Sequence, residues 1–143
     1  MKKTLIRQDT EKTFSKKEYE DHGDSLYQIG KASAFQSVLK TQVVWSLWES
    51  GKNQNWDLDT IIVGNGKLKN IPLQYRVWIG EKNDNGDWIY EYVNAKAKDG
   101  TIKEVWLAAD RAYRKAYKLY GRWHNFLEVL TFENGMIYPY FGS

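Results

Sequence analysis

The stretch Asp110–Trp123 reads DRAYRKAYKLYGRW and separates two kinds of side chain with the period of an α-helix. At about 100° per residue, its cations fall within an arc of about 100°; they are Arg111, Arg114, Lys115, Lys118 and Arg122. The opposite side carries small and aromatic residues, namely Ala109, Tyr113, Ala116, Tyr117 and Tyr120. The pattern predicts an amphipathic helix over residues 107–120, with the tyrosines against the core and the cations in solvent.

Strands are predicted before this helix. Residues 73–79 alternate with the period of a half-buried strand, and 88–93 return after the turn sequence Asn83–Gly86. Two short strands are also expected, one over 60–63 and one over 101–106, the latter preceded by a turn at Lys98-Asp99-Gly100.

A second hairpin is predicted after the helix. Residues 126–132 alternate up to the turn Glu133-Asn134-Gly135, and residues 136–141 pair back. Pro139 has no N–H to donate to a neighbouring strand, so the last strand is predicted at an edge of the sheet.

The N-terminal third has a weaker pattern. Apolar side chains recur at helical spacing over residues 31–50, which predicts a second helix closed by Gly51. The β-branched and aromatic run at 43–45 is also compatible with a strand. We expect a short strand at 4–8 and a mobile or irregular arm over 1–24.

These elements predict a single α+β domain over residues 1–143, because there is no repeat, linker or low-complexity tract. Its core is expected to be an antiparallel sheet of about five or six strands with two helices packed on one face. That length is enough to bury roughly 0.7 of the surface of the extended chain.

Composition excludes several kinds of site. The chain has no cysteine, which rules out disulfides, thiolate zinc sites, iron–sulfur clusters and a cysteine nucleophile. No apolar run approaches the roughly 18–20 residues of a transmembrane helix, and the N-terminus lacks the apolar core of a signal peptide. We therefore expect a cytoplasmic protein with no membrane partner.

The aromatic content is high, with 7 Trp, 10 Tyr and 5 Phe. That is more than a small core normally uses, so some rings are expected at a surface or a subunit interface. A homo-oligomer is one way of covering them.

Positive charge is concentrated in the predicted helix. The segment from Glu104 to Arg122 carries five cations and two acids, an excess equal to the net charge of +3 of the whole chain. Such a stripe can lie along a phosphate backbone, and neighbouring rings can stack on bases. The predicted binding residues are Arg111, Arg114, Lys115, Lys118, Arg122, Trp123 and His124. The alternative is the solvated face of a core helix.

Motifs for catalysis and metal binding are weak. The stretch 63–68 does not fit a phosphate-cradling loop, and no nucleophile-elbow sequence occurs. Asp57 and Asp59 could share a hard cation, but their spacing is also that of turn residues, and the acidic run at 18–24 is typical of a solvated turn. We expect neither a metal nor a cofactor.

Arg122, His124 and Glu128 have the residue types of an acid–base ribonuclease, although a capping or packing histidine is the simpler interpretation. The leading hypothesis is a small non-enzymatic binding protein whose basic stripe engages nucleic acid or a nucleotide. The alternative is a protein–protein module, such as an inhibitor, an immunity-type protein or a phage or bacterial accessory subunit, that uses exposed aromatic residues. A ribonuclease-like enzyme centred on His124 is the third hypothesis.

Overall fold

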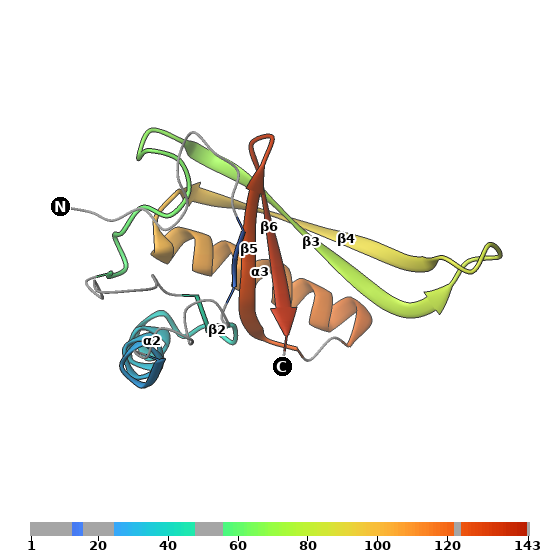
Figure 1. Ribbon diagram of the computed structural model, residues 1–143, viewed down its shortest axis with the longest axis horizontal. Coiled ribbons are helices and arrows are strands. Elements are labelled where there is room, and N and C mark those ends of the chain that lie inside the picture. Colours follow the sequence, from blue (N-terminus) through green and yellow to red (C-terminus); the bar gives the residue numbers. More distant parts are fainter. Residues whose placement is uncertain (1–12, 16–24, 48–55, 122–123, 143) are drawn as a thin grey trace.

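The computed structural model describes residues 13–15, 25–47, 56–121 and 124–142 (Figure 1). The chain order of its elements is β1 (Thr13–Ser15), α2 (Ser25–Leu39), β2 (Val44–Trp45), β3 (Lys69–Lys82), β4 (Trp88–Asp99), α3 (Ile102–Tyr120), β5 (Phe126–Glu133) and β6 (Met136–Gly142). The predicted α+β class is confirmed. The predicted strand at 4–8 lies outside the described residues, as does most of the predicted arm over 1–24, in which Thr13–Ser15 form a strand instead of irregular chain.

The strands form one sheet in the order β1-β5-β6-β3-β4, and β2 also pairs with β5. The sheet is mixed, not purely antiparallel as predicted, because β2 runs parallel to β5 and β6 runs parallel to β3. Both predicted hairpins are confirmed, and Asn134 and Gly135 supply the positive φ angles of 50° and 77° that a tight hairpin turn requires.

The prediction that Pro139 marks an edge strand is wrong. β6 lies between β5 and β3, and Pro139 is buried opposite Leu130 of β5. β6 and β3 pair at one position, Leu73 with Ile137. Figure 1 shows β6 and β3 crossing at an angle. Because the β3–β6 pairing does not include Pro139, its missing N–H removes no bond to β3.

Helix α3 begins at Ile102, so the predicted strand over 101–106 is wrong. Thr101 is the N-cap, and its hydroxyl accepts a hydrogen bond from the N–H of Glu104 at 3.3 Å. Asp99 in turn accepts from the hydroxyl of Thr101 at 2.6 Å. A threonine followed three residues later by glutamate is a helix-start signal, and here it outweighs the β-branched residues that suggested a strand.

The predicted helix over 31–50 is also corrected. Helix α2 ends at Leu39, Lys40 takes a left-handed φ of 59°, and Val44–Trp45 form β2, so Gly51 does not close a helix. Tertiary pairing with β5 therefore overrides the helical spacing in this segment. Residues 60–63 form no regular strand, although Ile61 makes an isolated bridge with Thr101.

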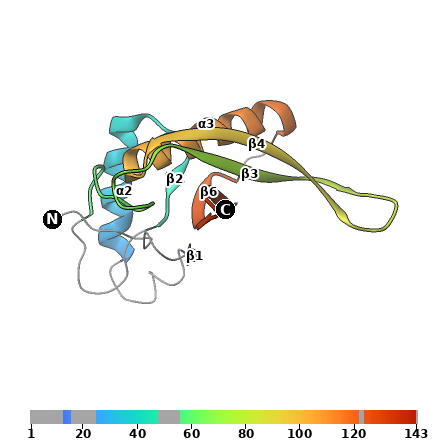
Figure 2. The ribbon, with the colours of Figure 1, turned by 90° about the horizontal axis from the view of Figure 1, so that it is seen from above.

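The core lies between α3 and the sheet. Trp45, Trp56 and Trp106 are completely buried, and Ala109, Ala112 and Ala116 let α3 approach the strands closely. Phe141 joins the layers, since its ring centroid lies 4.7 Å from that of Tyr75 and 5.8 Å from that of Tyr113. Figure 2 shows α3 running alongside β3 and β4.

Candidate functional site: an aromatic groove

A groove of about 1000 Å³ lies between the β3–β4 hairpin and the β5–β6 hairpin. Aromatic side chains make up much of its lining: Trp78 from β3, Trp88, Tyr90 and Tyr92 from β4, and Tyr138 and Tyr140 from β6. We call this surface the aromatic groove. It brings together two segments that are separated in sequence by the whole of α3.

Strand alternation explains why these rings share one side. Tyr75 and Val77 of β3 point into the core, so Arg76 and Trp78 point to the opposite face. In the antiparallel pairing, Arg76 lies opposite Tyr92 and Trp78 lies opposite Tyr90. The outer face of β3–β4 therefore carries large rings in adjacent positions, on the side away from α3.

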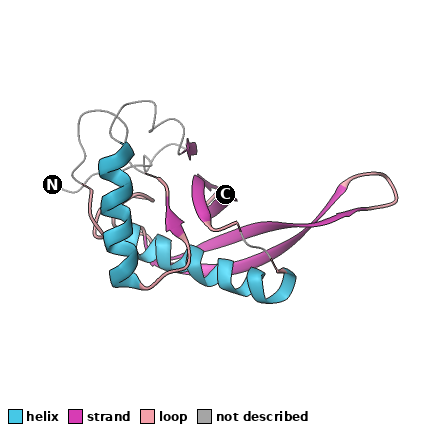
Figure 3. Ribbon diagram, turned by 90° about the horizontal axis from the view of Figure 1, so that it is seen from below, coloured by secondary structure: helices cyan, strands magenta, loops and turns pink. Residues whose placement is uncertain are grey.

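A bulge bends the far end of this hairpin. The register of β3 against β4 shifts between Trp78 and Lys82, and Gly80 within the shift has a φ of 85°. Bulges increase the local twist and bend the strand that contains them. Figures 2 and 3 show the hairpin tip turning toward the side on which β6 lies. The bend places Trp88 and Trp78 in contact, with ring centroids 5.0 Å apart.

The groove rings are accessible to solvent. The exposed fractions are 41% for Trp78, 50% for Trp88, 54% for Tyr92 and 61% for Tyr140. The expectation that some rings lie at a surface is confirmed. Exposed aromatic residues gathered in one depression mark binding surfaces more often than isolated ones do.

Two cations of the chain lie over groove rings. The guanidinium carbon of Arg76 is 4.2 Å from the centroid of the Tyr90 ring, and Lys82 Nζ is 4.2 Å from that of Trp88. These distances are those of cation–π contacts. Rings of the β3–β4 wall can therefore hold positive charge.

The opposite wall is acidic. Glu128 and Glu133 of β5 line the groove together with His124. The carboxylate of Glu128 lies directly against Gly142, where a Cβ atom would overlap it. Among the lining residues, Arg76 is the one Lys or Arg side chain and these glutamates are the two acids. The groove therefore has no excess of positive charge that would favour a phosphate ligand.

The predicted basic stripe is found on α3. Arg111, Arg114, Lys115 and Lys118 are exposed, whereas Arg122 and Trp123 lie outside the described residues. The tyrosine side is only partly as predicted, since Tyr113 is buried, Tyr120 is half-buried and Tyr117 is 54% exposed. Tyr117 lies at the border of the buried face, so its predicted packing against the sheet is wrong.

Two of these cations bind the edge of the sheet. β4 is an edge strand, and the carbonyl oxygens of Lys96 and Asn94 accept hydrogen bonds from Arg111 and from Lys115, the latter at 3.2 Å. Unpaired carbonyl groups on an edge strand are a template for unwanted strand pairing. Arg111 and Lys115 cover part of that edge, a role that the helical wheel does not reveal.

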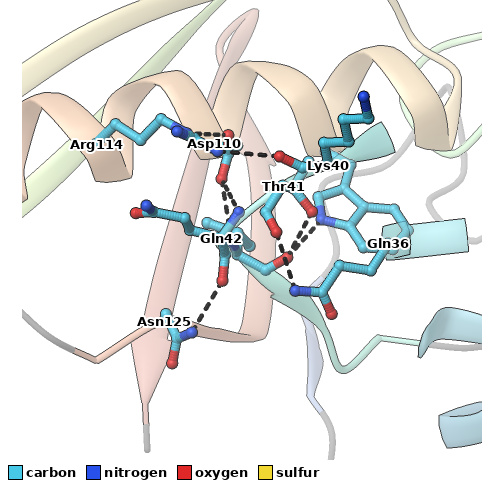
Figure 4. Close-up of polar contacts among 9 residues, drawn as sticks. Gln36, Lys40, Thr41, Gln42, Asp110, Arg114 and Asn125 are labelled. Carbon is cyan, nitrogen blue, oxygen red and sulfur yellow. Dashed lines mark hydrogen bonds and ion pairs between the residues drawn. The ribbon is translucent and has the colours of Figure 1, made fainter. Parts of the chain in front are cut away.

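Asp110 is the structural anchor of α3 (Figure 4). Its Oδ1 accepts from the N–H groups of Gln42 at 2.7 Å and Val43 at 3.0 Å. Its Oδ2 accepts from Arg114 Nε at 2.6 Å, and Arg114 also donates to the carbonyl of Lys40 at 3.0 Å. Asp110 is 6% exposed. The segment after α2 is therefore fixed to α3 through one buried carboxylate.

Asp57 and Asp59 form a turn. Asp57 Oδ1 accepts from the N–H of Asp59 at 3.0 Å, and Thr60 Oγ1 accepts from the N–H of Asp57 at 2.9 Å. Hydrogen bonding with Asp59 holds the pKa of Asp57 below its ordinary value. Within the described ranges, no three His, Asp or Glu side chains are grouped as metal ligands.

None of the described helices is long and apolar enough to cross a membrane. His124 lines the aromatic groove, whereas the lining includes none of the α3 cations of the predicted stripe. The sequence did not predict the groove; the one signal for it was the surplus of aromatic residues.

Comparisons with protein-family models, characterised proteins and solved structures gave no significant match to this chain.

Proposed function

We propose that this chain is a non-enzymatic binding protein that engages a partner protein through the aromatic groove. The observation that carries the proposal is the set of exposed rings, Trp78, Trp88, Tyr92 and Tyr140, along one depression. Trp, Tyr and Arg are the residues that most often dominate protein–protein binding energy. Arg76, stacked on Tyr90, adds the third of these types.

A protein partner fits the groove better than a nucleic acid does. Glu128 and Glu133 on one wall repel phosphate groups, and the two cations of the other wall, Arg76 and Lys82, lie over groove rings. The side chains of the basic stripe belong to α3, on the other face of β3–β4. Rings and phosphate-binding cations are therefore not combined in one surface.

The test is selection from a random peptide library. We expect the wild-type chain to enrich peptides whose affinity falls at least about tenfold in a Trp88→Ala/Tyr92→Ala variant, because each ring supplies a large exposed contact. Both side chains are about half exposed, so thermal unfolding of the variant should stay close to that of the wild type. Fluorescence anisotropy of labelled peptides measures the affinities.

The control is Val38→Ala on α2, an exposed apolar residue outside the groove lining. Peptides that bind both variants as well as the wild type would contradict the proposal. Light scattering adds a second measurement: a dimer that is lost in the Trp88→Ala/Tyr92→Ala variant would identify a second copy of the chain as the partner.

Nucleic acid is the second candidate, and it would bind α3 and not the groove. The exposed cations of α3 favour it, and Lys118 has no partner in the part of the chain that the structure describes. We expect Lys118→Glu to weaken binding of a single-stranded oligonucleotide, and the logarithm of the wild-type affinity to fall with the logarithm of the salt concentration by about 0.7 per phosphate contact. Arg114 is unsuitable for this test because it bonds Asp110 and Lys40. Binding that is independent of salt would rule this candidate out.

A further inference from the structure

We infer that the aromatic groove receives a basic side chain, Lys or Arg, from the partner protein, with Glu128 as its counter-ion. The inference rests on the proposed function and specifies the chemistry of the partner.

The Glu128 side chain is half-buried, and its carboxylate lies against Gly142. It lies so close to Gly142 that any side chain at that position would overlap it. Neither a salt bridge nor a hydrogen bond to this carboxylate is found in the described residues. A carboxylate that has lost part of its hydration and has no partner is stabilised by an incoming cation, which can form charge-assisted hydrogen bonds with it.

The surrounding rings favour the same ligand. An aromatic face attracts ammonium and guanidinium groups, and the attraction increases when the cation is partly removed from water. Arg76 over Tyr90 and Lys82 over Trp88 show that the β3–β4 wall holds cations at 4.2 Å from ring centroids. Tyr138 and Tyr140 of β6 provide further ring surface in the lining.

Charge is complementary to a basic segment. Arg76 stacks on the ring of Tyr90 and makes no ion pair with Glu128 among the described residues. Glu133 places a second carboxylate in the lining. An acidic partner segment would meet both carboxylates, whereas a basic one would be attracted to the wall that carries them.

Two variants test the inference on the peptides that the groove selects. Glu128→Gln keeps the shape of the side chain and removes its charge. Gly142→Ala keeps the charge and displaces the carboxylate, since the added Cβ meets only the flexible end of Glu128. We expect the selected peptides to be rich in Lys or Arg, and both variants to weaken their binding by about tenfold or more.

Glu91→Gln is the matched control. Glu91 is exposed on β4 opposite Val77, on the other face of the hairpin, so this change removes the same charge outside the groove. Its affinity for the peptides should match that of the wild type. Replacing the basic residue of a selected peptide by norleucine should cause the same loss as Glu128→Gln, and the two changes together should cause little further loss.

Two results would overturn the inference, and they differ. Peptides that need Trp88 and Tyr92, carry no basic residue and bind Glu128→Gln as tightly as the wild type would refute the basic side chain and leave the proposed function standing. Failure to select any peptide that depends on Trp88 and Tyr92 would refute the proposed function, and the inference with it.

Discussion

Replacing Asp110 with alanine should lower the free energy of unfolding by about 3–5 kcal/mol, the range found when one partner of a buried charged network is removed. The change leaves the N–H groups of Gln42 and Val43 without their acceptor. It also leaves Arg114 without its ion pair. Val43 is completely buried, so water does not readily replace the lost carboxylate oxygen.

Chemical denaturation of three variants measures this effect. Arg114→Ala should cost only about 1 kcal/mol, because its side chain is 46% exposed and the surrounding water replaces its contacts. Asp110→Asn should fall between the two, since the amide keeps one acceptor but presents a donor to Arg114. Similar losses for Asp110→Ala and Arg114→Ala would show that the surface ion pair, and not the backbone contacts, is what Asp110 contributes.

The second large effect is expected for Gly100→Ala, at the corner between β4 and α3. A Cβ atom at this position would overlap the carbonyl oxygen of Val63 and lie 2.9 Å from its carbonyl carbon. Backbone atoms do not move aside as a side chain does, so the segment at 62–63 has to shift. That shift would weaken the hydrogen bonds from Ile62 and Val63 to the Gly100 carbonyl, which are 2.8 Å and 3.1 Å long.

Overpacking together with weakened hydrogen bonds gives an expected loss of about 3–5 kcal/mol. Gly142→Ala is the matched control, because its Cβ would meet only the carboxylate of Glu128. It should cost less than about 1 kcal/mol in the same denaturation experiment. Equal losses for the two variants would show that the 62–63 segment yields freely and does not define the corner.

The local elements that the sequence predicted correctly are those with a strong short-range signal. The helical period of residues 107–120 is present in α3, and the hairpin turns around Asn83–Gly86 and Asn134–Gly135 are where the glycines and asparagines indicated. These features depend on the period of side chains and on the few residues that adopt positive φ. Both properties can be read from neighbours in the chain.

Other features depended on contacts distant in sequence. The end of α2 and the start of β2 are set by Asp110 and β5, which lie more than 60 residues further along the chain. A helical wheel places Asp110 beside the basic stripe, but it does not show that the carboxylate meets backbone N–H groups from another segment. Position in a helix period gives the direction of a side chain, not its partner.

The candidate site likewise combines features predictable from local sequence with features set by distant contacts. The sequence by itself determined the number of aromatic rings, the alternation that sends Trp78, Tyr90 and Tyr92 to one face, and the charge of α3. Only the tertiary structure set β6 beside β3, so that Glu128 and Tyr140 face those rings across a groove. The physical reason is that alternation determines which face a residue occupies, whereas the order of strands depends on how all the hydrophobic faces are buried together.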